Sequence, residues 1–410
     1  MKAIRFHVTI PRYAAGLALG KLSSRAYTSG LSCTIYEEIP DPQLPGEDWA
    51  VLATRLGGIC GTDTSAIYLK ASPYFSPLVS SPYTFGHENY AHLAEAGKGV
   101  EGWRLGERVV VEPTLWCAPR GFTSLCSYCA RGEVNLCERV TEGSLGAGWG
   151  IGNCRDTHGS WGPYFLAHRS QLYHLPDEIS DENALMIEPF AVGLHAAIQN
   201  YPKDSDKVLI IGAGSIGLCM LAALRALGSQ AEILVLARHS FQAEAAKRLG
   251  ASHVVRATRD VGFYAEIAEL IEAGIKQPLI GKCYLMGGVD LVFECVGSAV
   301  SLDDAFRLTR NGGRVVVVGL PGKVKSMDWS PIFARELEVR GSYVYNHAEQ
   351  FQGRCWKAFD LAIHLLTSGK ADLGWMVSHK FPLADYQQAL DLTNKRRSEK
   401  VVKIAFEFGE

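Results

Sequence analysis

From Tyr201 onward, short apolar runs alternate with segments of helical periodicity. The runs that predict buried strands are Val208–Ile211, Ile233–Leu236, His253–Val255, Leu291–Glu294 and Arg314–Val318. The segments between them whose apolar spacing predicts helices are Ile216–Leu227, Phe241–Leu249, Tyr264–Ala273 and Leu302–Leu308. Strands that alternate with helices form a parallel, doubly wound sheet. Residues 277–288 fit neither pattern, and we expect a loop insertion there.

The chain before Leu175 has a different pattern, rich in glycine, proline and short apolar runs. These runs predict short strands joined by long loops, and therefore a β-rich domain; examples are Trp49–Leu56, Tyr90–Ala94 and Arg108–Val111. After Gly341 the alternation stops. We expect a closing segment that packs back onto the first domain, with a helix over Phe351–Leu366 and apolar runs at Trp375–Val377 and Val401–Phe406.

Composition narrows the class of protein. The 410 residues suit two domains, and 47% hydrophobic with 20% charged residues is ordinary for a soluble enzyme. The net charge of −2 gives no general attraction to nucleic acid or anionic membrane. The uncharged stretch Val208–Leu224 is short for a bilayer span and contains three glycines. We expect neither a nucleic-acid nor a membrane partner.

Eleven cysteines, an odd number, occur without a secretory signal, since Pro11 and Arg12 interrupt the first apolar run. We therefore expect a cytoplasmic protein without a disulfide scaffold. Four of the cysteines are clustered with the spacing Cys117-x8-Cys126-x2-Cys129-x7-Cys137. Four thiolates in a turn-rich segment suit a closed, tetrahedral, structural zinc site. Two disulfides or free thiols are the alternative.

A glycine motif follows the strand VLII at the head of a helix. Gly212, Gly214 and Gly217 form G-x-G-x-x-G, in which the first permits a tight turn, the second lets backbone approach a pyrophosphate and the third allows close packing. The helix amides, beginning with those of Ser215 and Ile216, would face the phosphates. The motif predicts a dinucleotide site; a glycine-rich turn without a ligand is the alternative.

Two upstream segments carry groups that bind metal. GGICGTD contains Cys60, and FGHEN contains His87 and Glu88. Thiolate and imidazole suit zinc, and a catalytic zinc takes three protein ligands and leaves one position open. Glu188, in IEPFAVGLHA, is our candidate for the third ligand. Taken singly, these residues would be a buried thiol, a loop histidine and a helix-start carboxylate.

Together these motifs resemble the zinc-containing medium-chain dehydrogenases, which include alcohol, sorbitol, threonine and glucose dehydrogenases. The resemblance rests on GICGTD, GHE, the cysteine lobe, EPFAVGLHA, GAGSIG, FECVG and NGGRVVVVG in one order. It implies an α/β fold with a GroES-like β-rich catalytic domain over 1–188, to which 345–410 returns. A Rossmann nucleotide-binding domain would cover 189–344.

The resemblance also implies roles for single residues. A catalytic zinc would lie in the interdomain cleft on Cys60, His87 and Glu188, the glutamate being the form found in polyol dehydrogenases. Glu88 resembles a residue that approaches the metal or holds its water. Asp63 would orient His87, and Thr62 would carry the substrate proton. Zinc would favour the alkoxide, which expels hydride to the nicotinamide. Further cofactor contacts would come from Val296 in FECVG and from Gly319.

Two departures from the family pattern bear on the site. Ser65 stands where many members have a histidine at the end of the proton relay. Thr123 stands where the cysteine lobe normally has its first cysteine, and Cys117, six residues earlier, is the expected substitute. The insertion between Cys117 and Thr123, with Pro119 and Gly121, would have to loop out.

The segment after the second nucleotide-domain strand bears on the cofactor. Ala237 stands where NAD-specific members carry aspartate, and Arg238, His239 and Ser240 follow. Arg238 offers a fork of donors to a 2′-phosphate, so we expect NADP to be preferred over NAD. The alternative is a solvated arginine beside an unselective pocket.

The partner is expected to be a small alcohol, polyol or sugar, or an aldehyde or ketone in the reverse direction. A non-catalytic nucleotide-binding protein that keeps the fold is the competing class. Family habit suggests a homodimer or homotetramer. The loops 69–82 and 140–162 and their edges are rich in aromatic residues, which suit a ring-shaped substrate or simple packing: Tyr74, Phe75, Tyr83, Trp149 and Trp161.

Overall fold

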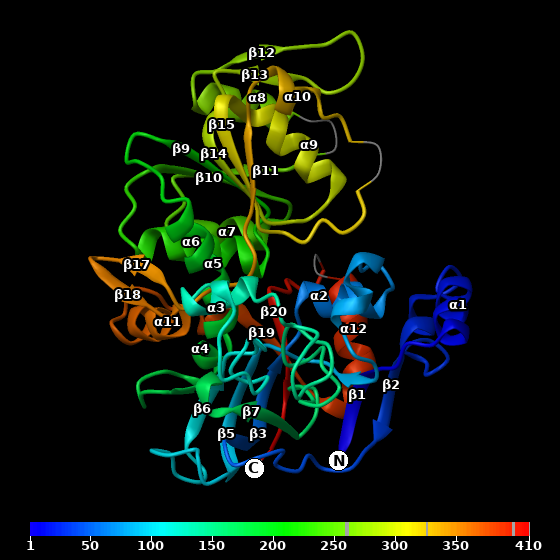
Figure 1. Ribbon diagram of the computed structural model, residues 1–410. Helices are drawn as coiled ribbons and strands as arrows, with labels where there is room; N and C mark the ends of the chain where they lie inside the picture. The colour runs from blue at the N-terminus through cyan, green and yellow to red at the C-terminus, as the bar shows by residue number, and fades with distance from the viewer. Residues whose placement is uncertain (259–261, 325–326, 396–397, 410) are drawn as a thin grey trace. The chain divides into compact units, whose positions relative to one another are not determined.

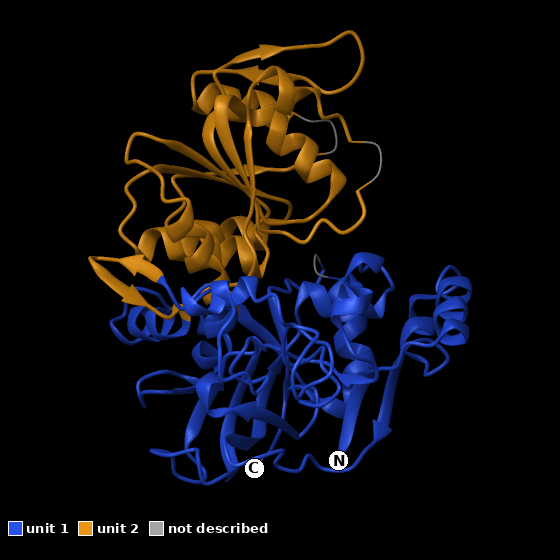
Figure 2. Ribbon diagram, viewed as in Figure 1, with its two compact units in different colours: residues 1–188, 346–348, 359–410 blue, residues 189–345, 349–358 orange. Residues whose placement is uncertain are grey.

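The computed structural model describes residues 1–258, 262–324, 327–395 and 398–409. The chain forms two compact units (Figure 2). The first comprises residues 1–188, 346–348 and 359–410, and the second comprises residues 189–345 and 349–358. The sequence assigned all of 345–410 to the first domain, whereas by its contacts the stretch 349–358 belongs to the second unit.

The second unit is built on a six-stranded parallel sheet in the order β11-β10-β9-β14-β15-β16 (Figure 1). The strands are β9 (Lys207–Ile211), β10 (Glu232–Ala237), β11 (His253–Arg256), β14 (Val289–Glu294), β15 (Thr309–Val317) and β16 (Glu338–Gly341). The helices between them are α6 (Ser215–Ala226), α7 (Ser240–Arg248), α8 (Phe263–Leu270), α9 (Ala299–Leu308) and α10 (Ser330–Ala334). This confirms the doubly wound sheet that the alternating pattern predicts.

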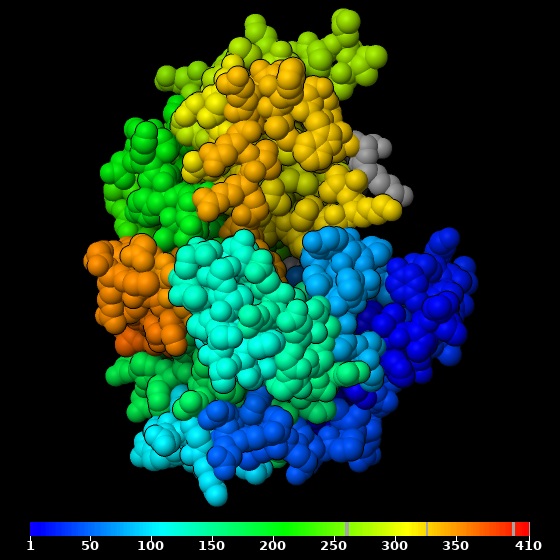
Figure 3. Space-filling view, viewed as in Figure 1, coloured from blue at the N-terminus to red at the C-terminus, as the bar shows by residue number. Residues whose placement is uncertain are grey.

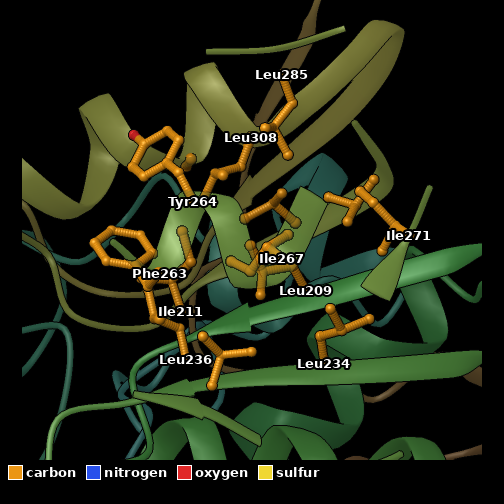
Figure 4. Close-up of a cluster of buried hydrophobic side chains, with 14 of the residues drawn as sticks. Leu209, Ile211, Leu234, Leu236, Phe263, Tyr264, Ile267, Ile271, Leu285 and Leu308 are labelled. Carbon is orange, nitrogen blue, oxygen red and sulfur yellow. The ribbon is translucent and has the colours of Figure 1, made fainter. Parts of the chain in front are cut away.

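One face of this sheet is covered by an apolar cluster (Figure 4). Leu209, Leu234 and Leu236 point from the strands toward Phe263 and Ile267 of α8, and all five are buried. Burying such a side chain contributes about 1.5–3 kcal/mol each relative to leaving it in water. The cluster therefore holds α8 against this face of the sheet.

The first unit contains a larger sheet in the order β19-β20-β3-β5-β6-β8, with β7 also paired to β3. The strands are β3 (Trp49–Gly58), β5 (Asn89–Ala96), β6 (Arg108–Val111), β7 (Tyr164–His168), β8 (Leu172–His174), β19 (Val377–Pro382) and β20 (Lys403–Glu407). β20 runs antiparallel to β3, with Ala405 opposite Gly58. The end of the chain thus lies beside the strand that leads to Cys60.

A smaller sheet in the first unit has the order β2-β1-β4, formed by β1 (Lys2–Phe6), β2 (Thr34–Glu38) and β4 (Tyr83–Thr84). The helix α1 (Ile10–Leu19) lies between β1 and β2 in the sequence and leaves Ile10 88% exposed. These N-terminal residues, deep blue in Figure 3, are exposed on the face in view. No helix among the described residues is both long enough and apolar enough to cross a bilayer.

Two expectations from the pattern are wrong in detail. Phe351–Leu366 is not one helix: the hairpin β17 (Glu349–Phe351) and β18 (Arg354–Trp356) precedes α11 (Ala358–Thr367). Gly353, with φ +72°, makes the turn of this hairpin, which the spacing of apolar residues does not predict. The stretch 277–288 is also more than a loop, because β13 (Tyr284–Met286) pairs with β12 (Gly274–Lys276).

Candidate functional site

The structure brings together the three upstream metal-binding groups. Cys60 follows β3 and caps the N-terminus of α2 (Gly61–Ile67), while His87 and Glu88 directly precede β5. The ligand atoms of these three residues all lie within 4.8 Å of one another. Because β3 and β5 are paired strands, their ends hold the thiol, the imidazole and the carboxylate in place. Sulfur, nitrogen and oxygen in this combination form a donor set that suits zinc.

Asp63 connects the first two of these groups. One carboxylate oxygen accepts a hydrogen bond from the Cys60 amide at 2.9 Å, and the other lies 3.5 Å from His87 Nδ1. Burial alone would lower the pKa of His87, but the charges of Asp63 and Cys60 hold this pKa well above its usual value. The imidazole lies in a strongly negative environment, which also favours a cation.

Glu88 has a buried partner that the sequence motifs do not reveal. The ammonium of Lys403, on β20, lies 2.5 and 2.7 Å from the two carboxylate oxygens of Glu88. Neither side chain is more than 2% exposed. A lysine inside the apolar run Val401–Phe406 was the available signal, because a buried lysine requires an anionic partner. Glu88 is therefore held by a cation of this chain at the edge of the metal-binding group.

The other catalytic candidates lie on two helices. Glu188 is buried in the first turn of α5 (Ile187–Gln199), and it is not part of the ligand group found among the described residues. Its role as a ligand stays a prediction. Thr62 is exposed at the start of α2, and Ser65 is half-buried on the same helix.

The four cysteines of the lobe form a second group. Their sulfur atoms lie within 4.8 Å of one another, and all four are buried: Cys117, Cys126, Cys129 and Cys137. The hydrogen bond from Cys129 lowers the pKa of Cys137, and the same contact raises that of Cys129. Four thiols this close cannot all ionise without a cation, so the group fits a closed zinc site.

Cys117 lies beside the other three cysteines because the residues that follow it form a compact loop. The amide of Gly121 bonds to the carbonyl of Ala118, and that of Phe122 bonds to Cys117. Arg120 fills the interior of the loop at 1% exposure. Its guanidinium donates to five backbone carbonyls, those of Leu115, Glu142, Leu145, Gly146 and Gly148. The sequence predicted the looped-out insertion but not the arginine that organises it.

In the second unit the glycine motif forms the turn between β9 and α6. Gly212 has φ +98°, a conformation that side chains disfavour. A Cβ atom on Gly217 would overlap the carbonyl oxygen of Gly212, whereas one on Gly214 would enter open space in front of the helix N-terminus. This space is bounded by helix amides and is the cradle that a pyrophosphate requires.

The neighbouring strand end completes this edge of the sheet. Val296 is 52% exposed just after β14, and Gly319 packs against the backbone of Val296 and Gly297. Glu294, which belongs to none of the predicted site residues, is fully buried and accepts hydrogen bonds from the amides of Val296 and Gly297. Burial raises the pKa of Glu294. Its carboxylate fixes the turn that presents Val296.

The segment expected to choose the cofactor follows β10. Ala237 is buried at the end of the strand, and Arg238 and Ser240 are exposed. His239 caps α7, where its amide donates to Gln242 and its ring stacks on Phe241. Among the described residues, Arg238 has no ion-pair partner. The position that would hold an aspartate in an NAD site is therefore apolar and is followed by an uncompensated positive charge.

The aromatic residues of the long loops separate into two groups. Tyr83 and Trp161 are buried in the core of the first unit, so their role is packing. Tyr74, on the short helix η2 (Pro73–Leu78), is 76% exposed and lies 5.4 Å from Phe75, whose ring lies 5.1 Å from Trp149. Only this second group leaves a ring accessible to solvent.

Comparison with known families matches both units. Residues 46–177 match the alcohol dehydrogenase GroES-like domain, and residues 215–360 match the zinc-binding dehydrogenase model. Together the two models cover more than half of the chain. They also agree in order with the β-rich unit and the parallel-sheet unit described above.

Individual proteins extend the match to nearly the whole chain. Sorbitol dehydrogenase of Bacillus subtilis (strain 168) is 27% identical over 364 residues, covering 88% of this chain and 91% of that protein. The crystal structure of 2R,3R-butanediol dehydrogenase from Bacillus subtilis is 25% identical with a TM-score of 0.71, covering 100% and 99%. A zinc-binding dehydrogenase from Sinorhizobium meliloti 1021, bound to NADP, is 25% identical with a TM-score of 0.70, covering 99% of each chain. The chain belongs to the zinc-type medium-chain alcohol and polyol dehydrogenases.

Proposed function

We propose that this protein transfers hydride between NAD(P) and a hydroxyl-bearing carbon of a small alcohol, polyol or sugar. The reverse reaction reduces the corresponding aldehyde or ketone with the same residues. The observation that carries the proposal is the gathering of Cys60, His87 and Glu88 in a chain that also has a complete pyrophosphate cradle. A nucleotide-binding protein without turnover would have no use for that metal-binding group.

A zinc ion bound to this group would act as a Lewis acid that stabilises the developing alkoxide. The residues of the chain would do the rest: Cys60 and His87 hold the metal, and Asp63 fixes the orientation of His87. Thr62, exposed at the start of α2, would accept the hydroxyl proton of the substrate. Ser65 on the same helix would leave the onward proton path to water.

Glu188 is our candidate for the third ligand, and Glu88 is the next candidate. Two observations bear on the choice: Glu188 is buried but is not one of the three residues whose ligand atoms gather, and Glu88 is one of them but is bound to Lys403. We expect Cys60→Ala and Glu188→Ala to abolish turnover while ADP still binds. If Glu188→Ala retains activity and Glu88→Ala does not, Glu88 is the third ligand.

The NADP preference is a separate part of the proposal, supported by Ala237 and the uncompensated Arg238. A charge-assisted contact to a phosphate is worth about 1.5–3 kcal/mol, so Arg238 would shift selectivity by about one to two powers of ten. The test is kcat/KM for each cofactor in wild type and Arg238→Ala. Equal values in wild type, or no loss with NADP in the variant, would contradict it.

Substrate, location and assembly are proposed on family grounds. The substrate class is tested by a screen of polyols, sugars and simple alcohols, followed through the absorbance of the reduced nicotinamide. We propose a cytoplasmic homodimer or homotetramer. Light scattering that reports a particle of one 44.7 kDa chain would contradict the oligomer.

A further inference from the structure

The strand next to β10, β11, carries a second arginine, Arg256, at the same carboxyl end of the sheet. β10 and β11 pair in parallel, with Ala237 opposite Arg256. The register holds to the end of both strands, because the Ala257 amide donates to the Ala237 carbonyl at 2.9 Å. Neighbouring strands lie about 4.8 Å apart. The backbone of Arg256 is therefore next to the residue that stands in place of the family's aspartate.

The alternation of side chains places Arg256 on the same face of the sheet as Ala237. Leu236 and its partner Val255 are buried together in the apolar cluster on one face. Successive residues of a strand point to opposite faces, so Ala237 and Arg256 both point away from that cluster. Ala237 has no side chain beyond Cβ, and Arg256 is exposed. Arg256 therefore extends from the same face and the same carboxyl end of the sheet as the residue at 237.

Neither guanidinium at this edge is neutralised within the described part of the chain. Arg238 and Arg256 have no ion pair there, although arginines elsewhere in the unit do, such as Arg314 with Glu338. Two like charges on adjacent strand ends repel each other unless an anion lies between them. A phosphate dianion accepts several donors from planar guanidinium groups and removes this repulsion.

We propose that Arg256 is a specificity-determining residue that, with Arg238, holds the 2′-phosphate of NADP from a second strand. The proposal rests on the proposed NADP preference and assigns part of that preference to Arg256, which lies outside both the G-x-G-x-x-G segment and the end of β10. A 2′-hydroxyl, as in NAD, offers no charge to either arginine. Arg256 therefore distinguishes the two cofactors without acting in the chemical step.

The direct test is calorimetric binding of 2′,5′-ADP (adenosine 2′,5′-bisphosphate) and of 5′-AMP, which differ only in the 2′-phosphate. Arg256→Ala should weaken the binding of 2′,5′-ADP about tenfold or more and leave the binding of 5′-AMP unchanged. Arg256→Lys, which keeps the charge but not the fork, should recover part of the affinity. The matched control is Lys247→Ala, because Lys247 is exposed at the far end of α7. It removes the same charge and should change neither ligand.

The outcomes separate this inference from the wider proposal. If wild type binds both ligands equally, there is no 2′-phosphate site and both fail, while activity with NAD still tests the dehydrogenase itself. If Arg238→Ala loses selectivity but Arg256→Ala does not, the role of Arg256 is refuted and the NADP preference stands. Should Arg256→Ala fold poorly, Arg256→Gln provides the same comparison, with thermal unfolding as the check.

Discussion

The buried pair Glu88–Lys403 gives the sharpest prediction for the first unit. We expect Lys403→Met to keep the length and apolar stem of the side chain but to remove its ammonium. Glu88 would then remain fully buried beside Cys60 and His87 without the cation that now lies 2.5 and 2.7 Å from its oxygens. Removing one partner of a buried pair costs about 3–5 kcal/mol, because the other charge stays out of water.

The free energy of unfolding should therefore fall by about 3–5 kcal/mol in Lys403→Met. The assay is urea unfolding of the zinc-loaded protein, monitored by tryptophan fluorescence. The matched control is Lys380→Met on the adjacent strand β19, where the lysine pairs at the surface with Glu182 and Glu407. Surface pairs contribute about 0–1 kcal/mol, so this variant should change little.

A double variant tests the cause. Glu88→Gln in the Lys403→Met background removes the stranded charge and should recover part of the lost stability. If Lys403→Met is no less stable than Lys380→Met, or if the double variant is the least stable of all, the reasoning from the buried charge is wrong.

The remaining predictions concern the lobe, the cradle and pH. Cys129→Ser should lower bound zinc by one ion per chain and reduce the unfolding temperature, and the exposed Cys355→Ser should do neither; elemental analysis and calorimetry decide. Gly217→Ala should lower the unfolding temperature, because the added Cβ overlaps the carbonyl oxygen of Gly212. Gly214→Ala should unfold at the wild-type temperature but bind ADP more weakly, because its Cβ enters the open space in front of the helix. If the two variants have the same unfolding temperature and the same ADP affinity, the pyrophosphate cradle is refuted. The hydrogen bond from Lys380 lowers the pKa of Glu182 in the folded protein. The pair therefore adds stability above the unfolded-state pKa of Glu182, and this stability is lost as the pH falls through the lowered folded-state pKa. In urea titrations at acid pH, the free energies of unfolding of wild type and Lys380→Met should therefore converge.

The alternating strands and helices of the second unit could be predicted from sequence because their apolar patterns are strong and regular. The strands of the parallel sheet are continuous apolar runs, and the sequence located β9, β10 and β14 to within a residue or two. The closing segment was harder. Phe351 and Cys355 are apolar and four residues apart, which is a helical spacing, but Gly353 turns the chain and puts them in a hairpin. The turn at Gly353, rather than the spacing of apolar residues, therefore decides the structure of this segment.

The candidate site could be predicted as far as residue types and spacing carry chemistry. Cys60, His87 and the four lobe cysteines have donor atoms that few other roles require, and the structure gathers each set. Lys403 and Arg256 could not be found in this way. Each is one charged residue on a short strand, and its partner is set by the fold of the sheet: the start of β5 brings Glu88 to Lys403, and β10 brings Ala237 beside Arg256. Such pairings depend on tertiary register, which spacing along one segment does not encode.

The central claim is zinc-dependent oxidation of a hydroxyl-bearing carbon with a nicotinamide cofactor. The most direct measurement follows the absorbance of the reduced nicotinamide while the zinc-loaded protein is offered a panel of polyols, sugars and alcohols with NADP or NAD. The account predicts reduction with at least one of these compounds, loss of that activity on chelation or in Cys60→Ala, and its return when zinc is added back to the chelated wild type. A zinc-loaded, folded protein that reduces neither cofactor with any of them, or equal turnover in Cys60→Ala, would contradict it.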